Sequence, residues 1–192
     1  MSPPRFIVFE GPDGAGKTTC AGLLAQRLGA DLLTTPSPGV RRYRDDLLHH
    51  LGSGQEAHQL FYLATVFAAS ETAAAALARG RSVVLDRYFL STQAYAAFRG
   101  TGLDLDDLGR HLTPACATVY LDPPLAVRQA RLRRRPTTLA DRETVPSAAD
   151  HRLRQEHLRR THLPVVGRLL HLTTAERTPT ALIDEIVAWL EL

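Results

Sequence analysis

The sequence contains a single lysine, Lys17, among 23 lysine and arginine residues. All the other basic side chains are arginines. Lysine carries a compact ammonium on a flexible stem, whereas arginine carries a planar guanidinium that binds its partners in a fixed fork. Because arginine is used at every other basic position, the lysine at position 17 indicates that this site requires a compact cation.

Cysteines and long apolar runs are also scarce. Cys20 and Cys116 form no motif, which argues against a disulfide framework or a cysteine metal site, and the eight histidines show no metal-ligand spacing. No run approaches the ~18 apolar residues of a membrane span. The N-terminal MSPPRFIVFE lacks the arrangement of a signal peptide. We expect a soluble, cytoplasmic protein with no membrane partner.

The charge balance is mild, with a net charge of +3 over 192 residues. The arginines are spread along predicted helices as well as clustered, which favours a solvated surface with a phosphate pocket over a nucleic-acid footprint. We therefore expect no nucleic-acid partner. The length suits one domain, residues 1–192, with a proper core and one mobile insertion.

Apolar patterning predicts an alternation of strands and helices. Strands are predicted at residues 5–10, 31–34, 81–86, 117–122 and 169–174. Helices are predicted at residues 18–28, 55–79, 124–135, 147–161 and 178–191, with a Pro/Gly loop after the second strand. This order is typical of an α/β fold with a parallel sheet and helices on both faces. Functional residues are expected at the carboxyl ends of the strands.

Residues 11–18, GPDGAGKT, form a complete G-x-x-x-x-G-K-[ST] motif between a predicted strand and a predicted helix. Glycines let backbone N–H groups turn towards phosphate oxygens, and the helix N-terminus adds partial positive charge. Lys17 would reach the β- and γ-phosphates, and the Thr18 hydroxyl would ligate Mg²⁺. The motif predicts a three-layer P-loop NTPase fold that binds ATP through Gly11, Asp13, Gly14, Ala15, Gly16, Lys17, Thr18 and Thr19.

Asp86 and Arg87 stand at the end of the third predicted strand, which lies beside the P-loop in this fold class. A carboxylate there holds Mg²⁺ or its water shell, so Asp86 joins Thr18 as a metal candidate. Arg87 would point into the same crevice and clamp an acceptor phosphate bidentately.

A basic stretch separates two predicted helices and predicts a lid at about residues 133–147. It contains Arg128, Arg131, Arg133, Arg134 and Arg135, and Asp141-Arg142-Glu143 follows it. Phosphoryl transfer relies on positioning and on cationic stabilisation of the equatorial oxygens. A mobile segment that delivers one or two arginines would supply that stabilisation and exclude water.

Three segments resemble the thymidylate kinase family: FIVFEGPDGAGKTT, VVLDRYFLSTQAYA, and LDPPLAVRQARLRRR followed by DRE. The resemblance extends over nearly the whole chain. It implies a kinase of nucleotide biosynthesis that uses ATP and Mg²⁺ and forms a homodimer through helices that include residues 55–79. The P-loop contains no arginine, as in family members whose catalytic arginine comes from the lid. Arg142 or Arg135 would then join Lys17 and Asp86 in catalysis.

The same resemblance implies roles for residues that would bind the acceptor. Asp13 would hydrogen-bond the sugar 3′-hydroxyl, and Arg87 would bind the 5′-phosphate. Phe61 would stack on the base and Thr92 would lie near its edge. Tyr95 would lie against the 2′-carbon and favour deoxyribose.

Two segments depart from the family pattern. Where the family usually has an arginine that donates to the thymine O4, this chain has Thr65, whose hydroxyl donates or accepts. The loop TTPSPGVRRYR replaces R-E-P-G-G-T and, with LFYLATVFAASE and DRYFLST, is similar to the mitochondrial UMP/CMP kinase branch of the group. That similarity places Arg44 near the acceptor phosphate.

These observations favour a nucleoside-monophosphate kinase for dTMP, dUMP, dCMP, UMP or CMP. An alternative is a kinase of a nucleoside or another specialised small molecule, which would need a carboxylate base to accept a hydroxyl proton. A non-catalytic nucleotide-binding module is the alternative of another class. A GTP switch would carry an N-K-x-D motif, which the sequence lacks.

Overall fold

The computed structural model describes residues 3–134, 136, 138–175 and 177–191. The strands are β1 (Phe6–Glu10), β2 (Asp31–Thr34), β3 (Val83–Asp86), β4 (Ala117–Leu121) and β5 (Arg168–Leu172). The α-helices are α1 (Lys17–Leu28), α2 (Pro38–Arg41), α3 (Arg44–His50), α4 (Gln55–Ala78), α5 (Phe89–Phe98), α6 (Leu125–Leu132), α7 (Leu139–Thr144), α8 (Ser147–Leu158) and α9 (Pro179–Trp189). Two short 3₁₀ helices are η1 (Asp106–His111) and η2 (Pro164–Val166).

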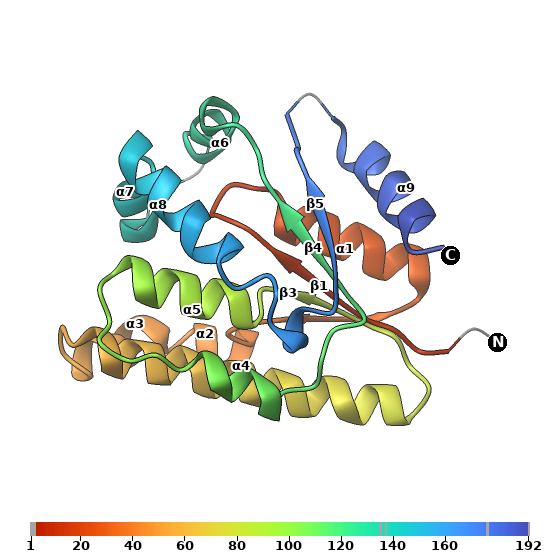
Figure 1. Cartoon of the computed structure of the whole chain (residues 1–192), viewed down its shortest axis with the longest axis horizontal. Coiled ribbons are helices and arrows are strands. Elements are labelled where there is room, and N and C mark those ends of the chain that lie inside the picture. Colours follow the sequence, from red (N-terminus) through yellow and green to blue (C-terminus); the bar gives the residue numbers. More distant parts are fainter. Residues whose placement is uncertain (1–2, 135, 137, 176, 192) are drawn as a thin grey trace.

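The strands form a parallel sheet in the order β2-β3-β1-β4-β5. Helices α1 and α9 cover one face, and α4 and α5 cover the other, with α8 packed against α5 (Figure 1). The predicted three-layer α/β class with a parallel sheet is confirmed. All five predicted strands are present, and their bounds differ from the prediction by no more than two residues.

Each face of the sheet builds its own core because side chains alternate along every strand. Ile7 and Phe9 of β1 pack towards α1 and α9, whereas Phe6 and Val8 pack towards α4 and α5. A central parallel strand is thus buried on both faces, which explains its uninterrupted apolar sequence.

Glu10, the last residue of β1, fixes the turn between β3 and α5. Its fully buried carboxylate accepts hydrogen bonds from the Tyr88 N–H (3.0 Å), the Ser91 N–H (3.2 Å) and the Ser91 hydroxyl. Burial raises the pKa of Glu10, and these hydrogen bonds partly oppose the rise. The contacts hold Arg87, which lies in the same turn, at the end of the sheet where the P-loop begins.

Four helices were not predicted from the sequence: α2, α3, α5 and α7. The Pro/Gly loop expected after β2 contains α2 and leads into α3, which has no buried residue. Most of α5 is buried, so its apolar residues show no helical stripe. The lid segment contains the short helix α7, which begins with a capping box between Thr138 and Asp141.

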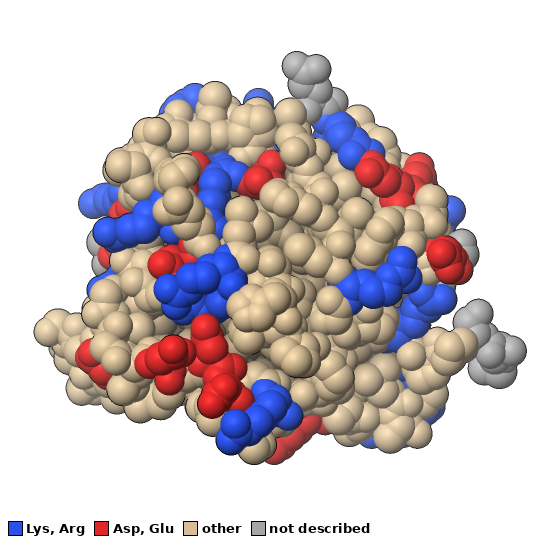
Figure 2. Space-filling model, viewed as in Figure 1, with Lys and Arg blue, Asp and Glu red and all other residues tan. Residues whose placement is uncertain are grey.

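Among the described residues, α4 is the helix that is long and apolar enough to cross a membrane by length and composition, with a mean hydropathy of 1.5. The inner side of α4 packs against α5, β2 and β3, and helices in protein cores pass the same test. Over the face drawn in Figure 2, acidic and basic side chains are intermingled among uncharged surface.

Candidate active site

The P-loop connects β1 to α1 and lies at the carboxyl ends of the central strands. Gly11 has φ 131°, and a Cβ there would come within 2.3 Å of the Leu121 carbonyl oxygen on β4. Gly16, which precedes α1, has φ 99°. Only glycine adopts such angles without strain, so the motif glycines are required by the tight path of the loop.

Lys17 is 5% exposed and begins α1. Its ammonium donates to the Pro12 carbonyl oxygen at 2.7 Å, which places the charge inside the curve of the loop. Burial, and next the neighbouring Arg87, lower the pKa of Lys17 to about 7. An anionic ligand beside the loop would stabilise the charged form.

Thr18 and Asp86 form the candidate metal site. The Thr18 hydroxyl donates to Asp86 Oδ2 at 2.5 Å, and Asp86 Oδ1 is buried without a hydrogen-bond partner in the described part of the chain. Mg²⁺ takes one or two protein oxygens and completes its shell with phosphate oxygens and water. The orphaned carboxylate oxygen beside the phosphate loop fits this ion, although the described residues hold no cluster of three or more His, Cys, Asp or Glu side chains.

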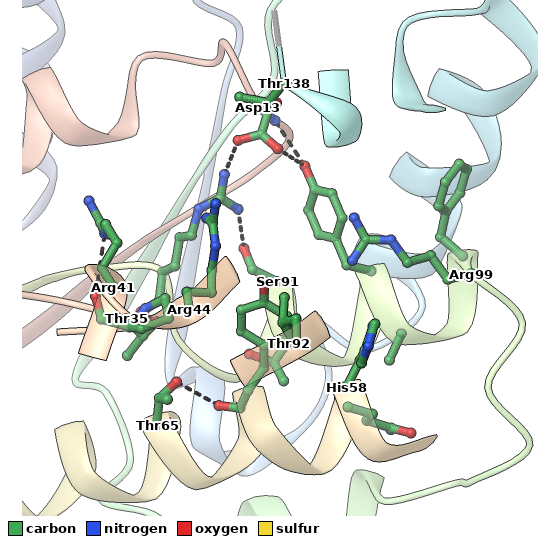
Figure 3. Close-up of a pocket in the computed structure, with 18 of the residues that line it drawn as sticks. Asp13, Thr35, Arg41, Arg44, His58, Thr65, Ser91, Thr92, Arg99 and Thr138 are labelled. Atoms are coloured by element: carbon green, nitrogen blue, oxygen red, sulfur yellow. Dashed lines mark hydrogen bonds and ion pairs between the residues drawn. The ribbon is translucent and has the colours of Figure 1, made fainter. Parts of the chain in front are cut away.

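Asp13, Arg87 and Tyr95 are in direct contact. Asp13 Oδ1 accepts an ion-pair hydrogen bond from Arg87, and Asp13 Oδ2 accepts one from the Tyr95 hydroxyl at 2.8 Å (Figure 3). Arg87 has φ 70°, a left-handed conformation that is uncommon outside glycine and occurs often at functional sites. The structure therefore brings together three residues that the sequence placed around one acceptor.

Two cations, Arg87 and Lys17, stabilise the negative charge of Asp13 in this cluster. Burial alone would raise the pKa of Asp13, but Arg87, Lys17 and Tyr95 lower it overall to well below its usual range. Burial and then Asp13 raise the pKa of Tyr95, whose hydroxyl stays protonated as a donor. Asp13 is an anion bound to a guanidinium and a phenol, so it is a poor proton acceptor.

A cavity of about 1120 Å³ opens from this cluster towards α3, α4 and α5. The predicted acceptor residues on its wall are Asp13, Arg44, Thr65, Arg87, Thr92 and Tyr95. The Thr65 hydroxyl donates to the Tyr62 carbonyl oxygen at 2.7 Å, and Thr92 donates to the Tyr88 carbonyl oxygen at 3.2 Å. Both hydroxyls thus give their protons to their own helices, and their oxygens remain as acceptors.

The structure does not place Phe61 on the cavity wall. The aromatic residue of α4 that lines the cavity is Tyr62, and the two rings contact each other edge-to-face at 5.2 Å. One position along a helix is a rotation of about 100°. The side of α4 that faces the cavity carries Gln55, His58, Gln59, Tyr62 and Thr65.

The arginines of the predicted lid stretch that the structure describes do not gather at one place. Arg142 is exposed and lines a second cavity of about 590 Å³ between α6 and α7 together with Arg133, and Lys17 is not on the wall of that cavity. Arg135 lies outside the described residues. Arg131 donates to the P-loop carbonyl oxygen of Ala15 at 3.1 Å and to the Thr174 carbonyl oxygen at 2.9 Å. Arg131 therefore stabilises the P-loop by linking its backbone to the segment after β5.

Several wall residues were not predicted, among them Arg41, Tyr62, Arg99 and Glu143. Arg99 pairs with Glu143 of α7 at 3.0 Å and lies over the Tyr95 ring at 5.6 Å, so it joins the lid segment to α5. Arg99 follows Tyr95 by one helical turn, and this spacing was the available signal. Arg41 donates to the Thr34 hydroxyl at 2.7 Å near the end of β2.

The parallel sheet, the phosphate loop with its buried lysine, and the adjoining acceptor cavity define an ATP-dependent phosphotransferase. The thymidylate kinase family model matches residues 9–162. The thymidylate kinase of Cupriavidus metallidurans is 35% identical and covers 97% of this chain and 98% of its own, and that of Thermomicrobium roseum is 37% identical over 78% and 77%. The chain belongs to the thymidylate kinase family and is a nucleoside-monophosphate kinase.

Solved structures agree on the fold. A thymidylate kinase from Candida albicans has a TM-score of 0.75 at 18% identity and covers 100% of this chain and 93% of that one. The thymidylate kinase from Ehrlichia chaffeensis has a TM-score of 0.66 at 22% identity and covers 98% and 100%. At these identities the comparison speaks for the architecture alone.

Proposed function

We propose that this kinase transfers the γ-phosphoryl group of ATP to a pyrimidine nucleoside 5′-monophosphate, with dTMP as the first candidate because the curated relatives are named thymidylate kinases. The observation that carries the proposal is the Asp13–Arg87–Tyr95 cluster, which joins the phosphate loop to the acceptor cavity. Donor and acceptor would therefore meet at residues that already contact each other.

The residues divide into a donor side and an acceptor side. On the donor side, Lys17 would bind the β- and γ-phosphates, and Thr18 with Asp86 would hold Mg²⁺, which neutralises phosphate charge. On the acceptor side, Arg87 and Arg44 would bind the 5′-phosphate. Holding the two phosphates in line and stabilising the transferred charge together supply most of the rate enhancement in such a reaction.

The geometry disfavours a hydroxyl acceptor. Such an acceptor needs a carboxylate that can take a proton. The Asp13 carboxylate is engaged by Arg87 and Tyr95 with its pKa held low, and the Asp86 carboxylate is assigned to the Mg²⁺ site. A phosphate acceptor is already anionic and needs cations instead. Arg41, Arg44 and Arg87 line the cavity and supply them.

The remaining acceptor contacts are proposed as follows. Asp13 would accept a hydrogen bond from the sugar 3′-hydroxyl, and Tyr95 would limit space at the 2′-carbon. Thr65 and Thr92 would face the base edge. The stacking role expected of Phe61 is better served by Tyr62, because Tyr62 lines the cavity.

We further propose that residues 133–147 act as the lid of a single kinase domain, and that the cytoplasmic enzyme is a homodimer. Two lid residues, Thr138 and Glu143, already line the acceptor cavity. The catalytic arginine would be Arg142 or Arg135. For the dimer, the outer side of α4 offers exposed apolar residues, with Leu60 half exposed.

The test is ADP release with ATP·Mg²⁺ and a panel of dTMP, dUMP, dCMP, UMP, CMP and dAMP. We expect turnover with one or more pyrimidine monophosphates and none with Lys17→Ala, whose thermal unfolding should still be cooperative. Turnover only with nucleosides would overturn the phosphate acceptor. If the folded wild-type protein releases ADP with no member of the panel, the proposal of a pyrimidine monophosphate acceptor is wrong.

A further inference from the structure

Arg128 on α6 is completely buried, which is unusual for the only group in a protein that is always charged. Its Nε donates to the Asp13 carbonyl oxygen at 2.5 Å. Its Nη1 donates to the Thr144 carbonyl oxygen at 2.8 Å and to Asp150 Oδ1 at 2.5 Å, and its Nη2 donates to the Thr144 hydroxyl. One side chain thus binds the P-loop, the last residue of α7 and the first turn of α8.

The two ends of this connection carry functional groups. Asp13 is held at its carbonyl oxygen by Arg128 and at its carboxylate by Arg87 and Tyr95. Thr144 directly follows Glu143, which lines the acceptor cavity and pairs with Arg99. A movement of the end of α7 would therefore be transmitted to the backbone of Asp13.

The chemistry requires arginine. Four N–H groups of the guanidinium point at four acceptors in three segments, and lysine has neither the number nor the fixed fork to match them. The stem of the side chain also packs on the loop, because a Cβ at Gly14 would lie 3.2 Å from Arg128 Cγ.

We propose that Arg128 is a positioning residue, which holds the P-loop and the C-terminal end of α7 in one fixed relation during phosphoryl transfer; this proposal rests on the proposed function. Arg128 touches neither nucleotide in this scheme. It acts through Asp13 on the loop and through Thr144 on the segment that carries Arg142.

The experiment compares Arg128→Met with Arg154→Met. Arg154 binds the same Asp150 at 2.7 Å and also Asp122, but it makes no contact with the P-loop or α7 among the described hydrogen bonds and ion pairs. In Arg128→Met the buried Asp150 keeps Arg154 as a partner, so the variant should fold.

Arg128→Met should lower kcat at least about 30-fold with KM values within about threefold, since a displacement of 1 Å can cost 100-fold. Arg154→Met should keep kcat within about threefold, and Arg128→Lys should recover part of the rate.

Two further measurements separate positioning from stability. In an Arg142→Ala background, Arg128→Met should lower kcat by a much smaller factor than it does in the wild type, because both changes act through the lid.

Amide hydrogen exchange at residues 141–145 should accelerate in Arg128→Met but not in Arg154→Met. Exchange needs no substrate, so it tests the connection even where the proposed function fails. Equal kcat in the two variants, independent effects of Arg128 and Arg142, or unchanged exchange would each overturn the proposal.

Discussion

At the scale of single residues, Lys17 shows how strongly the site constrains one charge. Its ammonium is nearly inaccessible to solvent and is surrounded by Arg87, Asp13, Asp86 and Glu10. Burial lowers its pKa from an ordinary value of 10.5 to about 7. In the proposed scheme this cation serves the phosphates, and its burial costs free energy in the folded chain, so the stability of the free protein should report this cost.

The lowered pKa of Lys17 predicts the direction in which the free energy of unfolding changes with pH. Between pH 7 and 10.5 the unfolded chain binds a proton at Lys17 that the folded chain has released. The free energy of unfolding of the wild type should therefore rise with pH relative to Lys17→Met, by at most about 1.4 kcal/mol per pH unit. Urea unfolding at pH 7.0, 8.0 and 9.0 measures the difference. Parallel pH profiles for the two proteins would show that Lys17 titrates normally in the fold.

Thr65 carries the prediction on base choice. Its hydroxyl is bonded within α4, so no positive donor from this position faces the cavity. Thr65→Arg should raise the ratio of kcat/KM for dTMP to that for dCMP by about tenfold or more, because a guanidinium donates to a 4-keto oxygen and meets a 4-amino group donor to donor. The control is Ala78→Arg, which introduces the same charge at an exposed position at the end of the same helix. An unchanged ratio in Thr65→Arg would remove Thr65 from the base edge.

The sequence identified residues whose type and spacing are both characteristic, such as Lys17, Asp86 and Arg87. It could not decide between Phe61 and Tyr62, because adjacent aromatics on a mostly apolar helix give no sign of which one faces the cavity. Arg128 was identified from the sequence only as one arginine of the basic stretch, and its buried position was missed for a different reason. An arginine in a basic stretch is normally solvated, and only the acceptors contributed by three separate segments show why this one is buried.

At the scale of elements, the proposed reaction depends on the position of the proposed lid, residues 133–147. Arg142 lines the cavity between α6 and α7, so its side chain must turn if it is to reach the transferred phosphoryl while Thr144 stays bound to Arg128. Arg142→Ala should then lower kcat at least about 100-fold with a small change in KM for the acceptor. Single-turnover kinetics measures this, with Arg159→Ala, at the exposed residue that follows α8, as control. A loss confined to KM would assign Arg142 to binding rather than to transfer.

Elements were predictable where burial on one side or on both sides left a periodic pattern. The strand at residues 31–34 matches β2 because charged and polar residues bound a short apolar run. Helix α5 was missed because seven of its ten residues are buried, which removes the amphipathic period. Helix α3 was missed because it buries nothing and follows two prolines and a glycine.

At the scale of the whole molecule, the sheet order brings the ends of β1, β3 and β4 together, so one edge collects the P-loop, Asp86 and Arg87. This convergence follows from parallel topology and explains why the position of the site could be predicted before its contacts. Contacts between α5, α7 and the P-loop could not be predicted, since they depend on how helices pack across that edge.

The proposed homodimer would form through the outer side of α4. Exposed apolar residues recur along it at Leu60, Ala64 and Ala68, one turn apart, and at Ala75, two turns further on, on a helix about 36 Å long. Small side chains let a second copy approach closely, and a buried arginine in such a contact would be costly without a partner. Ala68→Arg should therefore shift the protein from dimer to monomer in sedimentation velocity, whereas Ala188→Arg on α9 should not. A wild type that remains monomeric at 100-fold higher concentration would refute the dimer, and the apolar side of α4 would then need another occupant.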